Sequence, residues 1–124
     1  MSHFDDIGGE PALRAILEDF VGRVTGDVMI GFLFARVDRA RLVRLEIEHA
    51  AEHLGGPIRY TGRPLSAAHA AHRIQGGHFA RRKELLRQTL VAHGVSESVR
   101  DAWLGHVESL RAEITRDVGS ECGS

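Results

Sequence analysis

The chain has few of the residues that would cross-link it or place it in a membrane. Its 124 residues contain one cysteine, Cys122, which excludes an internal disulfide and fits a reducing cytoplasm. The 17 acidic and 16 basic residues nearly cancel, so neither nucleic acid nor an anionic membrane is attracted at long range. No apolar run approaches the roughly 20 residues that span a bilayer, and residues 1–6 lack the basic and apolar segments of a signal peptide. We expect a cytoplasmic protein that binds no nucleic acid and no membrane.

Strand patterns are nearly absent, and apolar residues recur at helical spacing. We expect long helices over about 11–25, 39–54, 78–93 and from 97 onward. Asp38 and Ser96 act as N-caps, and Gly76 and Gly77 break the chain before the third long helix. A short opening segment near 4–7 runs into a break at Gly8 and Gly9, and shorter helical turns are expected over 28–34 and after Pro64. The prediction is an all-α fold with one domain, 1–118, and a disordered tail, 119–124.

Eight histidines are many for this length, and one of them has unusual surroundings. His69 lies in an Ala-rich stretch that follows the Gly- and Pro-rich segment Gly55–Gly62. A neutral imidazole on a small-residue face suits a single protein ligand to a flat cofactor, as in haem iron held by one proximal His. A histidine among alanines is equally a pattern of partly exposed surface residues, so spacing alone leaves both interpretations open.

Several short motifs recur in a fixed order around this histidine. They are Ile7-Gly8-Gly9, Leu17-Glu18-Asp19-Phe20 with Arg23-Val24, Phe32-Leu33-Phe34, Leu54-Gly55-Gly56-Pro57 with Tyr60-Thr61-Gly62, Pro64-Leu65 with His69, and His78-Phe79. In these motifs the chain resembles the truncated haemoglobins, the small two-over-two globins, and most closely their group I. The resemblance runs from Phe4 to about Asp117.

The resemblance implies a haem b between the helix that begins after Asp38 and the segment that holds His69. His69 falls at the family's proximal iron ligand, and Phe34 at a phenylalanine that packs on the porphyrin face. Further cofactor contacts are implied for Leu42, Tyr60, Arg63, Leu65, His72 and Phe79. A porphyrin is an apolar plate with two carboxylates at one edge, so apolar walls and a polar or basic rim suit it. Phe34 and Phe79 also fit an ordinary core, and the arginines a solvated surface.

The chain departs from the family on the distal side, where a Tyr and a Gln usually donate hydrogen bonds to the bound ligand. Val21 stands at the Tyr position, and Leu42, which faces the sixth coordination position, offers no donor either. Glu46 stands at the usual Gln position. The resemblance implies a distal pocket formed by Phe20, Val21, Leu42, Glu46 and Ala50.

Glu46 is the one ionisable group in this pocket. Burial should raise the pKa of its carboxyl unless a cation pairs with it, and His49, Arg44 or Arg41 could supply that cation. Protonated Glu46 would donate to a bound ligand, whereas the ionised carboxylate would repel partial negative charge and favour ferric iron. Alternatively the helix rotates slightly, and Glu46 points outward to pair with an arginine.

We therefore expect a haem protein that binds oxygen, nitric oxide and carbon monoxide, with weak stabilisation of bound oxygen. Nitric oxide dioxygenase-like or peroxidase-like activity, or a role as a haem sensor or interaction module, are the alternatives. Glu46-x-x-His49 also matches half of a non-haem di-iron site, but no second Glu-x-x-His is present. We expect a monomer or weak homodimer with a reductase as candidate partner.

Overall fold

The structure, a computed structural model, describes residues 2–62 and 76–111 of the chain. Every regular element within these ranges is helical, which confirms the predicted all-α fold. The elements are α1 (His3–Asp6), α2 (Gly9–Thr25), the 3₁₀ turn η1 (Gly31–Phe34), α3 (Arg39–His53), α5 (Gly76–Ala92) and α6 (Glu97–Ser109). The predicted helix after Pro64 and the predicted tail 119–124 lie outside the described residues.

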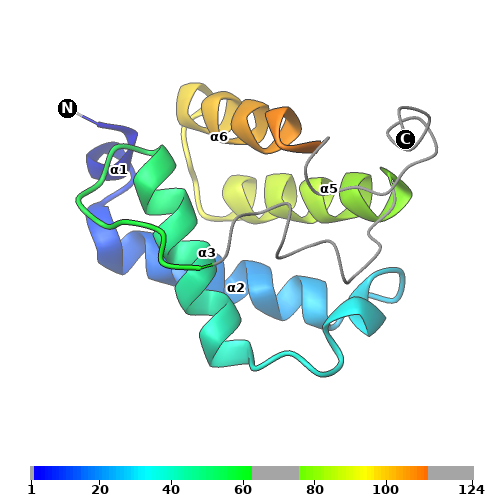
Figure 1. The fold of residues 1–124 in the computed structure, drawn as a ribbon. Coiled ribbons are helices and arrows are strands. Elements are labelled where there is room, and N and C mark those ends of the chain that lie inside the picture. The colour runs from blue at the N-terminus through cyan, green and yellow to red at the C-terminus, as the bar shows by residue number, and fades with distance from the viewer. Residues whose placement is uncertain (1, 63–75, 112–124) are drawn as a thin grey trace, which may run out of the picture.

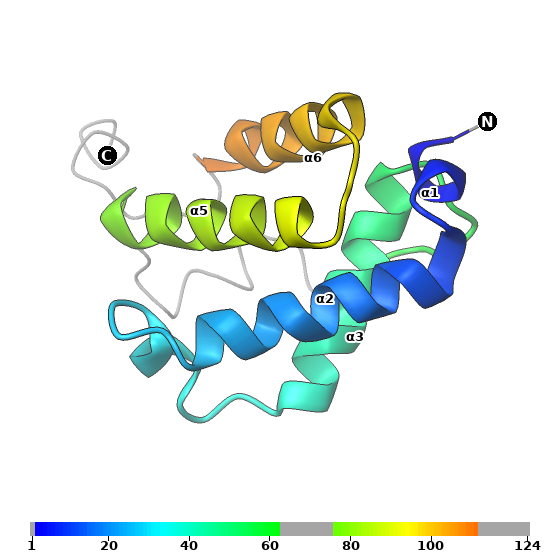
Figure 2. The same cartoon turned by 180° about the vertical axis from the view of Figure 1, so that it is seen from behind.

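The long helices form two packed pairs (Figures 1 and 2). α3 crosses α2 steeply in one pair, while α5 and α6 run antiparallel in the other. α2 also packs along α5, and α3 contacts α6 near its own C-terminal end. Each pair therefore covers the apolar face of the other, with α2 and α5 at the centre.

Local signals in the sequence set the ends of these helices. The Asp38 carboxylate accepts hydrogen bonds from the backbone N–H of Ala40 at 3.0 Å and of Arg41 at 3.3 Å, so α3 begins where the sequence predicts. Ser96 caps α6 in the same way through Val99 N–H at 3.4 Å. Gly94, which follows α5, has a φ of +71°, a conformation that suits glycine and ends the helix.

One predicted helix start is shifted. α5 begins at Gly76 rather than near His78, and both glycines lie in its first turn. The first N–H groups of a helix have no intrahelical partner, so glycine costs little there. A glycine pair is therefore compatible with a helix start.

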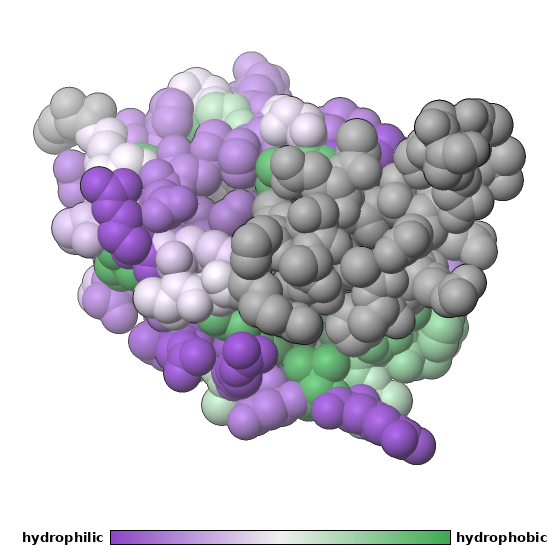
Figure 3. Space-filling model, in the orientation of Figure 1, coloured by the Kyte–Doolittle hydropathy of each residue, from purple (hydrophilic) through white to green (hydrophobic). Residues whose placement is uncertain are grey.

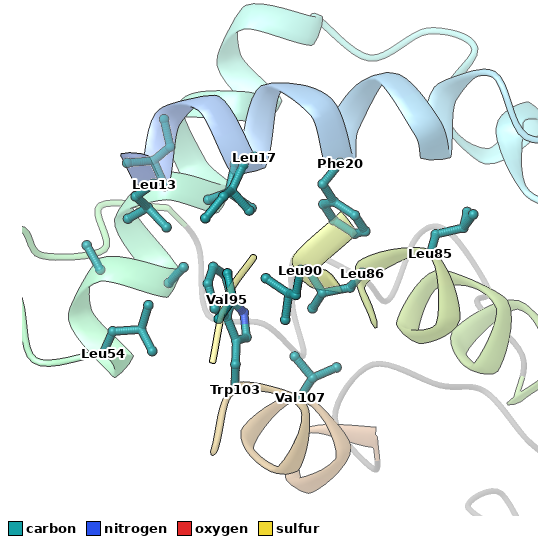
Figure 4. Packing of buried hydrophobic residues seen from close by; sticks show 14 of the residues in the cluster. Leu13, Leu17, Phe20, Leu54, Leu85, Leu86, Leu90, Val95, Trp103 and Val107 are labelled. Atoms are coloured by element: carbon teal, nitrogen blue, oxygen red, sulfur yellow. The ribbon is translucent and has the colours of Figure 1, made fainter. Parts of the chain in front are cut away.

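The core lies between α2, α5 and α6 (Figure 4). Leu13, Leu17 and Phe20 project from α2 toward Leu86 and Leu90 of α5, and Trp103 and Val107 close the cluster from α6. The buried residues of α3 are Ile47, Ala50 and Ala51, at 3%, 7% and 0% exposure, and two of the three are small. Alanines at this crossing allow the α3 backbone to lie close to α2.

The 3₁₀ turn η1 separates an exposed corner from the interior. Val28, Met29 and Phe32 are 96%, 52% and 64% exposed, and Figure 3 shows apolar surface at the lower right, where this corner lies. Leu33 and Phe34 instead pack against the core cluster. The turn thus directs Phe34 inward, toward the space beside α3.

Two glycines test how tightly the α1 end is packed. A Cβ on Gly56 would lie 2.7 Å from the Phe4 ring, whereas a Cβ on Gly77 would meet nothing within 4 Å. We expect Gly56→Ala to lower the free energy of unfolding by about 1–3 kcal/mol, because the buried ring must move. Gly77→Ala should leave it unchanged or raise it by up to about 1 kcal/mol. Urea unfolding measures both, and equal stability of the two variants would contradict this packing.

Candidate functional site

α2 and α3 carry the residues that the sequence assigns to the distal pocket. Phe20 and Val21 of α2 are each 1% exposed, and Ala50 of α3 is 7% exposed. Leu42, in the first turn of α3, is only partly buried. Val21 lies outside the main core cluster although it is buried, whereas Phe20 and Ala50 belong to that cluster. This side of the site is apolar apart from Glu46.

The Glu46 carboxylate is paired with a cation that the sequence analysis did not identify. Its Oε2 accepts a hydrogen bond from Nη2 of Arg82, on α5, at 2.6 Å. The two side chains are 23% and 17% exposed, respectively. The Arg82 guanidinium also lies over the Phe20 ring, 5.0 Å from its centroid. The pair therefore joins α3 to α5 beside a residue of the predicted distal wall.

The three cations proposed from the sequence do not pair with Glu46. Arg44 lies 3.8 Å from Glu48 instead, and no ion pair of Arg41 is seen within the described ranges. Burial lowers the pKa of His49, although the nearby Glu46 charge acts in the opposite direction. The helical spacing of α5 does indicate Arg82. It lies three residues after Phe79 and four before Leu86, so it shares the buried side of the helix with them.

Phe79 and Phe34, the two predicted aromatic contacts, differ in their surroundings. Phe79 is 1% exposed and belongs to the core cluster, with the Arg111 guanidinium 4.6 Å from its ring centroid. Phe34 is partly exposed and packs only against the edge of the cluster. Phe34 therefore has apolar surface to offer a cofactor, while most of Phe79 is already covered.

The loop after α3 is held against that helix by two carboxylates. Glu48 Oε1 accepts hydrogen bonds from the backbone N–H of Thr61 at 2.9 Å and from its hydroxyl at 2.6 Å. These bonds lower the pKa of Glu48. Glu52 Oε2 accepts from the backbone N–H of Tyr60 at 3.2 Å, and the Tyr60 ring meets the His49 ring edge-on, with centroids 5.5 Å apart. The loop is thus ordered by side chains of α3.

A cluster of histidines links α3 to α6, a contact that the sequence analysis did not predict. The rings of His53 and His106 stack with centroids 3.6 Å apart and an interplanar angle of 12°. His49 lies 5.5 Å from His106. The Nε2 atoms of His53 and His106 are buried and make no hydrogen bond to the described residues. Burial is the main cause that lowers the pKa of all three imidazoles.

Four of the predicted contact residues lie outside the described part of the chain. They are Arg63, Leu65, His69 and His72, all within residues 63–75. Across 2–62 and 76–111 there is no group of three or more His, Cys, Asp or Glu that could hold a metal ion. The di-iron alternative gains no support there, because Glu46 is engaged by Arg82. None of the helices seen in those ranges is long and apolar enough to cross a membrane.

Comparisons with known proteins agree with this architecture. The family model for bacterial-like globins matches residues 2–116. A group 1 truncated hemoglobin GlbN from Mycolicibacterium paratuberculosis is 34% identical over 113 residues, which cover 91% of this chain and 83% of that protein. The Nostoc commune GlbN is 28% identical over 111 residues, covering 90% and 94% of the two chains.

Solved structures show the same arrangement of helices. The truncated hemoglobin of Tetrahymena pyriformis in its Fe(III) form superposes with a TM-score of 0.87 at 26% identity, covering 93% of this chain and 98% of that one. The 2/2 hemoglobin of Synechococcus, in the cyanomet state with covalently attached heme, gives 0.87 at 26% identity, covering 92% and 98%. The two crossed helix pairs thus define a two-over-two globin fold. The chain belongs to the bacterial-like globin family, as a group I truncated haemoglobin.

The histidine cluster predicts a pH dependence of stability. Each imidazole has a lowered pKa in the fold, so the unfolded chain binds more protons once the pH falls below 6.5. Stability should therefore decrease as the pH drops from 6.5 through the lowered pKa values. We expect the melting temperature of the wild type to fall between pH 7.5 and 5.5 by roughly 2–5 °C more than that of His106→Asn. Parallel melting-temperature curves for the two proteins would contradict this.

Proposed function

We propose that this chain binds haem b with His69 as the axial ligand, and binds oxygen, nitric oxide and carbon monoxide at the haem iron. The observation that carries the proposal is the family match over residues 2–116, because membership of a globin family implies haem binding. The proposal also includes the other cofactor contacts predicted from the sequence, some of which lie outside the described residues. When bound, the haem would supply the metal centre and its redox chemistry. The chain would ligate the iron, exclude water and set the polarity of the ligand pocket.

The described residues fit an apolar plate. Phe34 and Leu42 are large apolar side chains that stay only partly buried, one from η1 and one from the first turn of α3. Both belong to elements that contact α2. Partly uncovered apolar surface of this kind suits a porphyrin face. Tyr60 and Thr61, which the resemblance puts near a haem propionate, are held in place by hydrogen bonds to Glu52 and Glu48.

The distal side offers no neutral side-chain donor among its described residues. Val21 and Leu42 are apolar, and the Glu46 carboxylate is engaged by Arg82. A neutral ligand would have to displace an ion pair to gain a hydrogen bond. This arrangement supports weak stabilisation of bound oxygen, while carbon monoxide and nitric oxide depend less on such a donor.

We also propose that the protein works in the cytoplasm. A single cysteine and balanced charge favour a reducing cytoplasm over an oxidising compartment. We propose a monomer or weak homodimer that receives electrons from a reductase, and whose role is oxygen handling or nitric oxide removal.

The axial ligand can be tested by removing its imidazole. We expect purified His69→Ala to lose most of its bound haem and the intense Soret absorption, because no protein atom then holds the iron. His93→Ala is the matched control, since His93 contacts Asp19 at 2.9 Å, away from the distal residues. Absorption spectra of the ferric and ferrous proteins measure the outcome. An unchanged spectrum and haem content in His69→Ala would overturn the assignment.

Oxygen release tests the donor-poor pocket. One hydrogen bond stabilises a bound ligand by about 1 kcal/mol. The absence of one or two such bonds therefore raises the oxygen dissociation rate severalfold to a hundredfold. We expect fast oxygen dissociation and rapid autoxidation in the wild type, measured by stopped-flow mixing with carbon monoxide. A slow, high-affinity oxygen complex would contradict the proposal.

A further inference from the structure

Arg82 is the one residue of the described distal side whose charge and donors the proposed function leaves unused. It stands among the buried positions of α5 with 17% of its side chain exposed. Its guanidinium is fixed from two directions, by Glu46 at 2.6 Å and by the Phe20 ring at 5.0 Å. No other hydrogen bond of this side chain is seen within residues 2–62 and 76–111. A guanidinium donates N–H groups in a fixed fork, and the Arg82 fork is directed toward the Glu46 carboxylate.

We propose that Arg82, with Glu46 as its displaceable partner, forms a binding site for small inorganic anions on the distal side of the haem. The inference rests on the proposed function, since the anion would occupy the sixth coordination position of ferric iron. Glu46 holds the guanidinium when no anion is present. An entering anion takes over a guanidinium N–H, and the carboxylate loses that bond.

The pair distinguishes anionic from neutral ligands by competition. A neutral diatomic molecule offers too little charge to replace a carboxylate on a guanidinium. An anion carries the same charge as Glu46 and can accept the same charge-assisted hydrogen bond. The exchange therefore costs little for an anion, whereas a neutral ligand must bind beside the intact ion pair.

The surroundings make Arg82 the dominant cation here. Burial lowers the pKa of His49, which keeps that imidazole neutral near pH 7. Arg44 is directed to Glu48 at 3.8 Å, on the exposed side of α3. Phe20, at 1% exposure, supports the guanidinium plane on an apolar face and limits its contact with water. A partly desolvated cation interacts with an anion more strongly than a hydrated surface arginine does.

Ferric holoprotein titrated with sodium azide and with sodium nitrite tests the site, with spectral dissociation constants as the readout. We expect Arg82→Leu to weaken both anions roughly tenfold or more, since a hydrogen bond to a charged group is lost. Glu46→Gln should strengthen both, because the competitor has been neutralised. The carbon monoxide affinity of the ferrous variants should change by a smaller factor than the azide affinity, because carbon monoxide carries no charge.

Arg87→Leu is the matched control, because it removes the same charge from the same helix at a side chain that pairs with Glu84 and is 49% exposed. Arg82→Lys keeps the charge and should retain part of the anion affinity if Arg82→Leu fails to fold. The inference is overturned if Arg82→Leu weakens azide no more than Arg87→Leu does, or if Glu46→Gln also weakens it. Absence of a Soret band in the wild type would instead refute haem binding itself.

Discussion

The close crossing of α3 over α2 is the constraint on which the rest of this small globin depends. Ala50 and Ala51 bury almost completely beside Ile47, so two of the three buried side chains of α3 are small and its backbone can lie close to α2. Larger residues at Ala50 or Ala51 would push α3 outward, and Leu42 and Glu46 would move with it.

Sequence reasoning succeeded where the signal is local. The Asp38 and Ser96 caps depend on neighbouring residues, and the structure confirms them. α5 begins two residues earlier than predicted, at Gly76, because glycine is tolerated in the first turn of a helix. The family resemblance, rather than periodicity, selected the two-over-two arrangement among all-helical folds.

The polar contacts of the site were harder to predict, for a physical reason. Glu46 and Arg82 are 36 residues apart, and His53 and His106 are farther still. The sequence analysis sought the partner of Glu46 on its own helix, where Arg41, Arg44 and His49 are near in sequence. The sequence did contain one indication of this pair, an arginine between Phe79 and Leu86 on an otherwise apolar stripe. A buried cation requires an anionic partner, so this position predicts a carboxylate on a neighbouring helix.

These long-range contacts give α3 three polar attachments in addition to its apolar crossing. Arg82 holds its middle, the stack with His106 holds its end, and Glu48 and Glu52 tie the following loop to its outer side. The loop carrying Tyr60 must therefore follow any shift of α3. His69, the proposed axial ligand, follows this loop in the sequence. An anion that exchanges with Glu46 at Arg82 would release one of the three attachments, so distal binding and the geometry of this loop are mechanically linked through a single helix.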